Sequence, residues 1–197
     1  MQNPKQHIIR IAENLFFKKG FHLTTIRDIS RKANVNVSMI SYYFNSKEQL
    51  YLNIFDELEE AMIKIRNAKF PIPNKSDAIK KFIQMTLKKM TAAHKTIFLL
   101  IAEQSHPSTS KVKVKIDQIK SLHLEYFLSI IDEGLTNSKT KTKEHLVLYH
   151  SIFGVSKELF MLYKSSKNFM ADSNNKVTSD IYDQILKLFD PIILSLK

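Results

Sequence analysis

Residues 24–50 constrain the fold of this chain most strongly, because three helix-start signals follow one another there at short intervals. Two capping boxes, each a hydroxyl residue followed three positions later by an acidic or amide residue, begin at Thr25 and Ser46. Between them, Asn36 is a favoured N-cap for a short helix over residues 37–44. Two short helices joined by a tight turn and followed at once by a third have the spacing of a helix-turn-helix.

The predicted helix over residues 37–44 has one face without charge. Ile40 and Phe44 lie one helical turn apart and are enough to hold one side of the helix against a core. The other side carries hydroxyl, phenol and thioether groups, with no carboxylate to repel phosphate. Such a face suits contact with base edges in the major groove of DNA. A small three-helix subdomain with an ordinary solvated face is the alternative interpretation.

The N-terminal part of the chain is also similar to a known family. Residues 8–55 resemble the DNA-binding region of TetR-type transcriptional repressors, and the matching positions are Ile8, Ala12, Leu15, Phe16, Gly20, Phe21, Thr24, Thr25, Asp28, Ile29, Ala33, Val35, Tyr42, Phe44, Ser46, Lys47, Glu48 and Leu50. The resemblance implies a ligand-responsive repressor that binds a pseudo-palindromic operator as a homodimer, with half-sites roughly 34 Å or a multiple apart. It further implies that a small molecule entering the C-terminal helices changes the separation of the two recognition helices.

Contacts to double-stranded DNA are expected from the helix-turn-helix and the residue that follows it. We expect Thr25 and Lys47 to bind phosphates, since Lys47 adds positive charge to exposed backbone amides at the start of its helix. The residues expected to contact bases, sugars or nearby phosphates are Val37, Ser38, Met39, Tyr42 and Tyr43, and Arg27 and Asn36 are further expected DNA-binding residues.

The charge of the chain agrees with a polyanionic partner. The net charge is +11, and residues 1–50 carry eight Lys and Arg against three Asp and Glu. Basic residues are therefore concentrated around the predicted helix-turn-helix, as binding to nucleic acid requires. A basic helical module that binds a protein partner or an acidic membrane surface is the alternative from another class.

Composition argues against several other classes of protein. Cysteine is absent, which rules out disulfides and thiolate metal sites and makes a reducing cytoplasm the expected location. The N-terminus lacks the apolar run of a signal peptide, and no stretch approaches the roughly 18 apolar residues of a membrane span. The seven histidines form no metal-binding pair, and the three glycines form no phosphate loop. We therefore expect no enzymatic activity, no metal and no cofactor.

Helical periodicity extends over most of the remaining chain and predicts an all-α fold of about nine helices. Besides the two helices of the helix-turn-helix, the predicted helices cover residues 4–19, 46–68, 76–94, 96–105, 110–133, 143–165 and 179–196. We expect an N-terminal three-helix DNA-binding domain, residues 1–46, followed by a C-terminal helical bundle, residues 47–197, for ligand binding and dimerisation.

The last two predicted helices are apolar on more than one face, which calls for packing partners on two sides. A second subunit is the simplest partner, and it gives a four-helix dimer interface with two helices from each chain. The residues expected in that interface are Leu148, Ile152, Val155, Leu159, Ile181, Ile185, Leu188 and Ile192. A monomeric bundle that buries both faces itself is the alternative.

His123 lies within an apolar stripe of its predicted helix and has two interpretations. It is either a core histidine hydrogen-bonded to a neighbour or part of the wall of a ligand cavity. A cavity between helices would be mostly apolar with a few polar groups, and its other wall residues would be Phe98, Tyr126, Phe127, His150 and Phe153. Few acidic residues lie nearby, which favours a neutral or anionic effector over a strongly cationic one.

Overall fold

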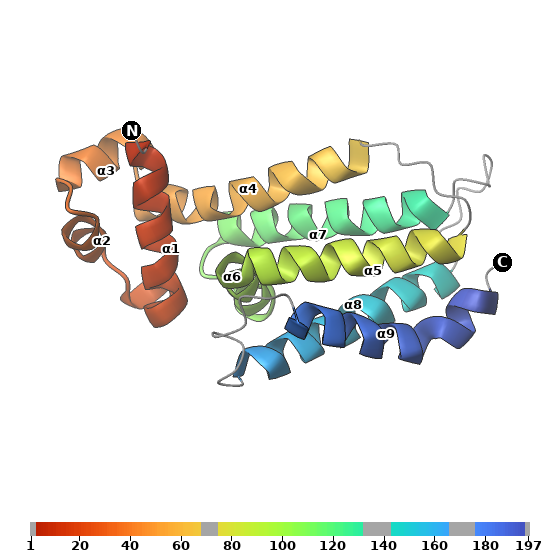
Figure 1. Cartoon of the computed structure of the whole chain (residues 1–197). Coiled ribbons are helices and arrows are strands. Elements are labelled where there is room, and N and C mark those ends of the chain that lie inside the picture. Colours follow the sequence, from red (N-terminus) through yellow and green to blue (C-terminus); the bar gives the residue numbers. More distant parts are fainter. Residues whose placement is uncertain (1–2, 68–74, 132–142, 166–175, 196–197) are drawn as a thin grey trace. The chain divides into compact units, whose positions relative to one another are not determined.

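The structure is a computed structural model that describes residues 3–67, 75–131, 143–165 and 176–195 (Figure 1). Within these ranges the chain forms nine α-helices and no strand. The helices are α1 (Pro4–Leu23), α2 (Ile26–Ala33), α3 (Val37–Phe44), α4 (Lys47–Asn67), α5 (Lys75–Ala92), α6 (His94–Ser105), α7 (Ser110–Ile131), α8 (Lys143–Ser165) and α9 (Lys176–Ser195). The all-α class and the N-terminal helix-turn-helix predicted from the sequence are confirmed.

The helices gather into two compact units. The N-terminal unit, residues 1–65 and 93–122, holds α1, α2, α3 and α6 with most of α4 and the first half of α7. The C-terminal unit, residues 66–92 and 123–197, holds α5, α8, α9 and the end of α7. The N-terminal compact unit therefore contains α6 and most of α4 in addition to the helix-turn-helix. The predicted functional boundary after residue 46 is a different division of the chain and stays a prediction.

The helix-turn-helix forms because its helix ends are specified locally. The Thr25 hydroxyl accepts a hydrogen bond from the Asp28 N–H at 3.1 Å, and the Thr25 N–H donates to Asp28 Oδ2 at 3.2 Å, which completes the predicted capping box. Hydrogen bonds from Thr25, first from its side chain and then from its backbone, lower the pKa of Asp28. At the other end of α2, Asn34 adopts the left-handed conformation (φ 54°) that the tight turn requires.

An aromatic cluster joins α4 to α1 in the core of the N-terminal unit. Tyr51 of α4 is 1% exposed, and its ring centroid lies 4.7 Å from that of Phe16 and 5.0 Å from that of Phe21. The Tyr51 hydroxyl donates to Oε1 of Glu103 at 2.9 Å, and the Ser108 N–H donates to Oε2 of the same carboxylate at 2.5 Å. The buried carboxylate of α6 thus has hydrogen-bond donors from α4 and from the turn before α7, as a buried charge requires.

Gly20 interrupts α1 and sets the direction of its last residues. Its backbone has φ 77° and ψ 169°, a conformation that residues with a side chain rarely adopt. A Cβ at this position would meet nothing within 4 Å, so backbone conformation and not space is the reason for glycine. The helix predicted over residues 4–19 ends just before this glycine. After the break, Phe21 packs against Tyr51.

The C-terminal unit has an aromatic core of its own. α5, α8 and α9 pack against one another, and the ring of Phe82 on α5 lies 4.9 Å from that of Phe127 on α7. Tyr149 of α8 completes the cluster with its ring 5.4 Å from Phe127. Among the described helices, none combines the length and the apolar character needed to cross a membrane.

Candidate nucleic-acid interface

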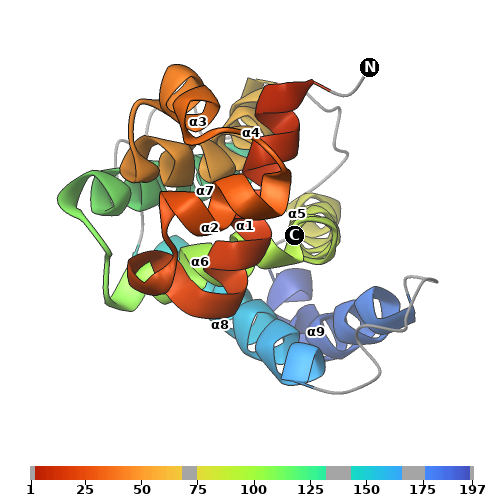
Figure 2. The same ribbon diagram turned by 90° about the vertical axis from the view of Figure 1, so that its left-hand side faces the viewer.

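The recognition helix α3 is held from one side and open on the other. Ile40 and Phe44 are at most 1% exposed and anchor the helix to the core of the N-terminal unit. Tyr42 is 80% exposed, Val37 43% and Met39 38%. These three side chains and the exposed Ser38 are predicted DNA contacts, while Tyr43 is half-buried beside Tyr42. In two perpendicular views α3 lies at the edge of the N-terminal unit, away from α6 (Figures 1 and 2).

Asn36 occupies the N-cap position of α3, as its residue type predicted, but it does not cap the helix through its side chain. The residue has the extended backbone of an N-cap, with φ −71° and ψ 148°, and it is exposed. Its amide therefore stays available to a partner outside the protein, at the end of the helix that enters the groove first in helix-turn-helix proteins.

Lys47 is bound to the end of α1, a role that its place in the sequence did not indicate. Its ammonium group donates to the carbonyl oxygens of Phe21 at 3.0 Å and Thr24 at 3.1 Å. The same group lies 4.3 Å from the centroid of the Phe21 ring. An ammonium has three N–H donors, so these two bonds leave one for the predicted phosphate contact.

Replacing Lys47 with Met is expected to lower the free energy of unfolding by about 1–3 kcal/mol, because two partly buried carbonyl groups lose their donor while the side-chain stem is kept. Urea unfolding followed by circular dichroism measures the change. Lys64→Met is the matched control, since Lys64 is exposed in the last turns of the same helix and makes neither bond. Equal unfolding curves for the two variants would show that the hydrogen bonds from Lys47 to these carbonyl groups do not stabilise the fold.

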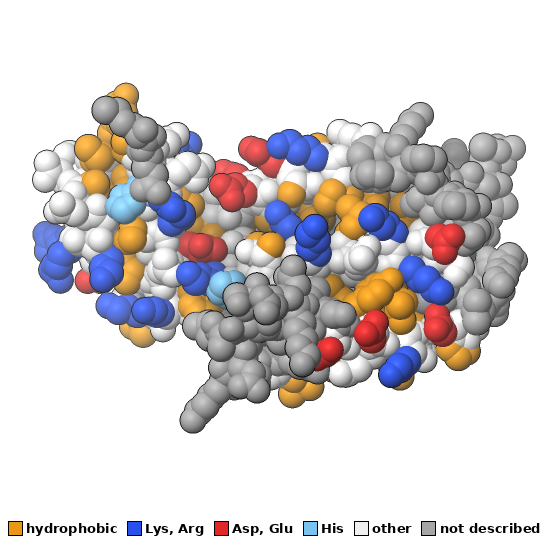
Figure 3. Space-filling view, in the orientation of Figure 1, with side chains coloured by type: hydrophobic (Ala, Val, Ile, Leu, Met, Phe, Trp, Pro, Cys, Tyr) orange, Lys and Arg blue, Asp and Glu red, His pale blue; other side chains and the backbone are white. Residues whose placement is uncertain are grey.

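Basic side chains surround the helix-turn-helix. The predicted residue Arg27 is exposed on α2, and exposed basic residues near the ends of α1 and α2 include Lys18, Lys19, Arg31 and Lys32. Figure 3 shows lysine and arginine side chains gathered over this part of the N-terminal unit. These four cations were not in the predicted set, and the signal that points to them is the local excess of positive charge.

The predicted cavity residues are distributed over both compact units. His123 is half-buried, with Nε2 3.1 Å from the Thr86 hydroxyl and Nδ1 2.9 Å from the Tyr149 hydroxyl. Burial lowers its pKa to about 4 and raises that of Tyr149. His123 thus has a hydrogen-bond partner on each ring nitrogen, as the first interpretation expects, while a place in the wall of a ligand cavity stays a prediction.

The other predicted wall residues divide between the two units. Phe127 and Tyr126 are buried in the C-terminal unit, and Phe153 is half-buried there with its ring 5.2 Å from that of His123. His150 is exposed on α8, with its ring 5.0 Å from that of Tyr149. Phe98 belongs to α6 of the N-terminal unit, where its ring packs 5.1 Å from that of Phe17. The structure thus groups three of the five with His123.

The apolar residues of α8 and α9 that were predicted for the dimer interface differ in their burial. Leu148, Ile152 and Ile185 are buried within the chain itself, because one face of each helix packs inside the C-terminal unit. Val155 and Leu159 are half-buried, while Ile181 and Ile192 lie outside the side chains that the structure describes. Among the side chains that the structure describes, the large apolar residues most exposed on these helices are Val147, Leu162 and the predicted Leu188, which is 60% exposed.

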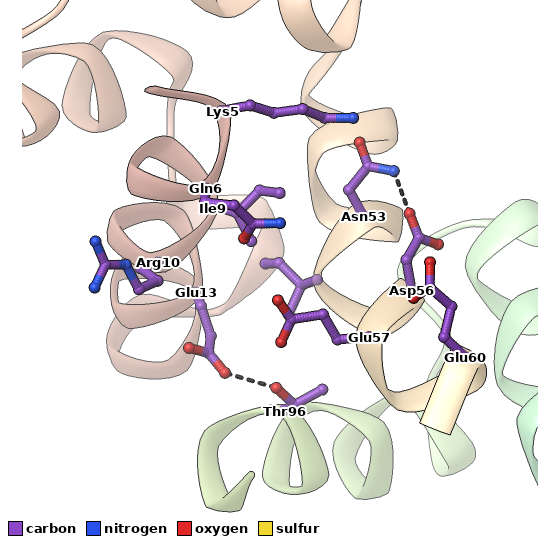
Figure 4. A pocket seen from close by; sticks show the side chains of 11 residues that line it. Lys5, Gln6, Ile9, Arg10, Glu13, Asn53, Asp56, Glu57, Glu60 and Thr96 are labelled. Atoms are coloured by element: carbon purple, nitrogen blue, oxygen red, sulfur yellow. Dashed lines mark hydrogen bonds between the residues drawn. The ribbon is translucent and has the colours of Figure 1, made fainter. Parts of the chain in front are cut away.

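A pocket of about 280 Å³ lies between α1, α4 and α6 of the N-terminal unit (Figure 4). Its carboxylates belong to Glu13, Asp56, Glu57 and Glu60, and its basic groups to Lys5 and Arg10. Glu13 accepts a hydrogen bond from the Thr96 hydroxyl at 2.6 Å, which joins α1 to α6 across the pocket floor. None of the predicted DNA or effector residues lines it. In the described part of the chain, no group of three or more acidic or histidine side chains is arranged to hold a metal ion.

An anchored helix with an outward uncharged face, in a basic three-helix arrangement, defines a helix-turn-helix DNA-binding protein. The family model "Bacterial regulatory proteins, tetR family" matches residues 8–54. Over 139 residues the chain is 24% identical to the HTH-type transcriptional regulator QacR of Staphylococcus aureus, covering 70% of this chain and 73% of QacR. Over 62 residues it is 43% identical to the probable HTH-type transcriptional regulator YttP of Bacillus subtilis, covering 32% and 30% of the two chains.

Solved structures agree with the fold over nearly the whole chain. The crystal structure of AibR in complex with isovaleryl coenzyme A and operator DNA has a TM-score of 0.69 and 14% identity, covering 94% of this chain and 97% of AibR. At this identity the likeness shows the fold alone, and the assignment of function rests on the N-terminal match. Residues 8–54 thus match the helix-turn-helix DNA-binding region of the TetR family, and the chain is similar to transcriptional regulators that carry this region.

Proposed function

We propose that the chain represses transcription as a homodimer on a pseudo-palindromic operator, with α3 of each subunit in the major groove. The main support for this proposal is the exposed face of α3. Tyr42 on this face is 80% exposed, while Ile40 and Phe44 on the other face are buried and anchor the helix. Two-fold symmetry of the protein requires matching symmetry of the DNA, so the half-sites repeat at about 34 Å or a multiple.

Phosphate contacts position α3 in this arrangement. Thr25 and Arg27 are exposed at the start of α2, and Lys47 lies at the start of α4 with one donor left for the backbone of DNA. Lys18, Lys19, Arg31 and Lys32 extend the positive surface and supply affinity that does not depend on sequence. Such a regulator acts in the cytoplasm, where the DNA is, and needs no catalytic group.

The C-terminal part, residues 47–197 in this proposal, provides dimerisation and an effector site. Val147 and Leu162 on α8 and Leu188 on α9 present apolar surface to a second subunit. The likeness of fold to AibR, whose structure holds isovaleryl coenzyme A, supports a small-molecule effector for this chain as well. The effector releases DNA if it binds the non-DNA conformation more tightly than the DNA-binding one.

Selection from a random 40-bp duplex library tests the proposal directly. Purified protein is expected to enrich sequences that contain an inverted repeat, because both α3 helices read the same half-site. Enrichment of single half-sites without symmetry would exclude binding as a two-fold dimer. A failure to enrich any duplex would exclude sequence-specific DNA binding.

Arg27→Gln is expected to weaken binding to all duplexes alike and to reduce its salt dependence. Each lost phosphate contact lowers the slope of log K against log salt by about one, hence by about two for a dimer. Fluorescence anisotropy with a mixed-sequence duplex, measured at several salt concentrations, gives the slope. Lys64→Gln removes an exposed positive charge at the far end of α4 and is the matched control. An unchanged slope for Arg27→Gln would show that this residue does not bind phosphate.

A further inference from the structure

The exposed chemistry of α3 limits which bases it can read. Guanine is usually recognised by Arg or Lys, which donate two hydrogen bonds to O6 and N7, and cytosine by a carboxylate that accepts from N4. Residues 36–45 are all described by the structure and contain no Lys, Arg, Asp or Glu. The recognition helix therefore lacks the charged side chains that normally select G·C pairs.

The same face is suited to A·T pairs. Thymine differs from the other bases in the major groove by its 5-methyl group, which apolar side chains contact. Val37, Met39 and Tyr42 place apolar atoms on the exposed side of α3, and Tyr42 is the most exposed of the three. Asn36 adds a side-chain amide that makes no capping bond, and an amide pairs with N6 and N7 of adenine.

We propose that α3 reads its operator mainly through thymine 5-methyl groups, contacted by Val37, Met39 and Tyr42, with Asn36 on an adenine. This inference rests on the proposed function and adds the class of sequence that the helix recognises. Ser38 and Ser41 are also exposed, but a hydroxyl group bonds to any base and selects little. Operator half-sites are therefore A·T-rich at the positions that face α3.

The second observation behind the inference is that other side chains supply the fully buried contacts of the helix. Ile40 and Phe44 supply the buried contacts of the helix, whereas Val37, Met39 and Tyr42 keep 43%, 38% and 80% of their surface exposed. Residues that face solvent with apolar groups, on a helix that the core already anchors, are available for contact with a partner. DNA is the partner of a helix-turn-helix regulator, and methyl groups are its apolar feature in the major groove.

The test uses the duplex enriched by the selection described above, resynthesised with single base analogues. Replacing one thymine by 2′-deoxyuridine removes only the 5-methyl group, and replacing guanine by 7-deazaguanine removes only the N7 acceptor. At each contacted thymine, uracil is expected to weaken binding about threefold to fivefold, as measured by anisotropy. The 7-deazaguanine duplexes are expected to bind within a factor of two of the parent at every guanine that faces α3.

A mutant cycle assigns each methyl group to a side chain. Met39→Ala is expected to weaken binding to the thymine duplex but to bind the uracil duplex about as well as the parent protein does, because protein and DNA changes then remove the same contact. Val37→Ala is expected to behave likewise at a different thymine. Ser41→Ala is the control on the same exposed face and is expected to leave the preference for thymine over uracil unchanged.

The outcomes separate this inference from the function on which it rests. If a duplex is enriched but uracil substitution changes its affinity by less than a factor of 1.5 at every position (roughly the precision needed to see one methyl group), thymine readout is wrong. A loss with 7-deazaguanine opposite α3 that exceeds any loss with uracil would likewise overturn it. If no duplex is enriched, the proposed function fails first and the inference fails with it.

Discussion

Leu188→Glu is expected to convert the dimer to monomers and to lower the affinity for the selected operator by at least about a hundredfold. Leu188 is 60% exposed on α9, so the substitution should not disturb the fold of the subunit. In a dimer it places a charge, and by two-fold symmetry two charges, in an apolar interface. A monomer also loses the gain from binding two linked half-sites, which is commonly a factor of about 10²–10⁴.

Sedimentation velocity and anisotropy with the operator measure the two effects. Val114→Glu is the matched control, because Val114 is a similarly exposed apolar residue on α7, outside the proposed interface. That variant should stay dimeric with unchanged affinity for DNA. If Leu188→Glu remained dimeric, the assignment of this face of α9 to the interface would be wrong. Val147→Glu would then test whether the exposed face of α8 alone forms the interface.

Acidification from pH 7 to pH 4 is expected to remove about 3 kcal/mol of stability through His123 alone. In the folded chain its pKa is about 4, below the ordinary value of 6.5, because burial disfavours the charged ring. Between these two values the unfolded chain binds a proton that the folded chain does not. The contribution to stability is therefore complete above pH 6.5 and is lost as the pH falls towards 4, at about 1.4 kcal/mol per pH unit.

Urea unfolding of the parent and of His123→Gln at several pH values isolates this contribution. The variant has lower stability at pH 7, since Thr86 and Tyr149 lose well-placed partners, but its stability should fall less steeply with acid. Carboxylates titrate in both proteins, so their effect cancels in the difference between the two slopes. Equal slopes for parent and His123→Gln would show that His123 can be protonated in the folded chain.

Local signals predicted the helix-turn-helix well. The Thr25–Asp28 capping box and the residue types at Asn34 and Asn36 fix helix ends through bonds or backbone angles within a few residues, so neighbouring sequence contains the information. Ile40 and Phe44 were recognised as the anchored side of α3 because the helical period alone separates them from the exposed positions. The exposed contacts predicted for α3 follow from the same geometry.

Contacts between distant parts of the chain were beyond such reasoning. Lys47 bonds to carbonyl groups 26 and 23 residues away, and nothing in its local pattern separates this role from a phosphate contact. Phe98 shares the apolar character of the predicted cavity wall, yet α6 belongs with α1, where Phe98 packs on Phe17. On α8 and α9, periodicity showed that two faces are apolar but not which face the chain uses for its own core. Leu148 and Ile152 proved to be buried and Leu188 exposed.

The construction of α3 separates the scaffold from the specificity of the protein. Two side chains that point inward, Ile40 and Phe44, anchor the helix, whereas the DNA contacts proposed for it come from side chains that point outward. Natural drift or a randomised library can therefore change the outward set while Ile40, Phe44 and Gly20 are kept. Paralogues that diverged in this way would share one architecture and control unrelated genes.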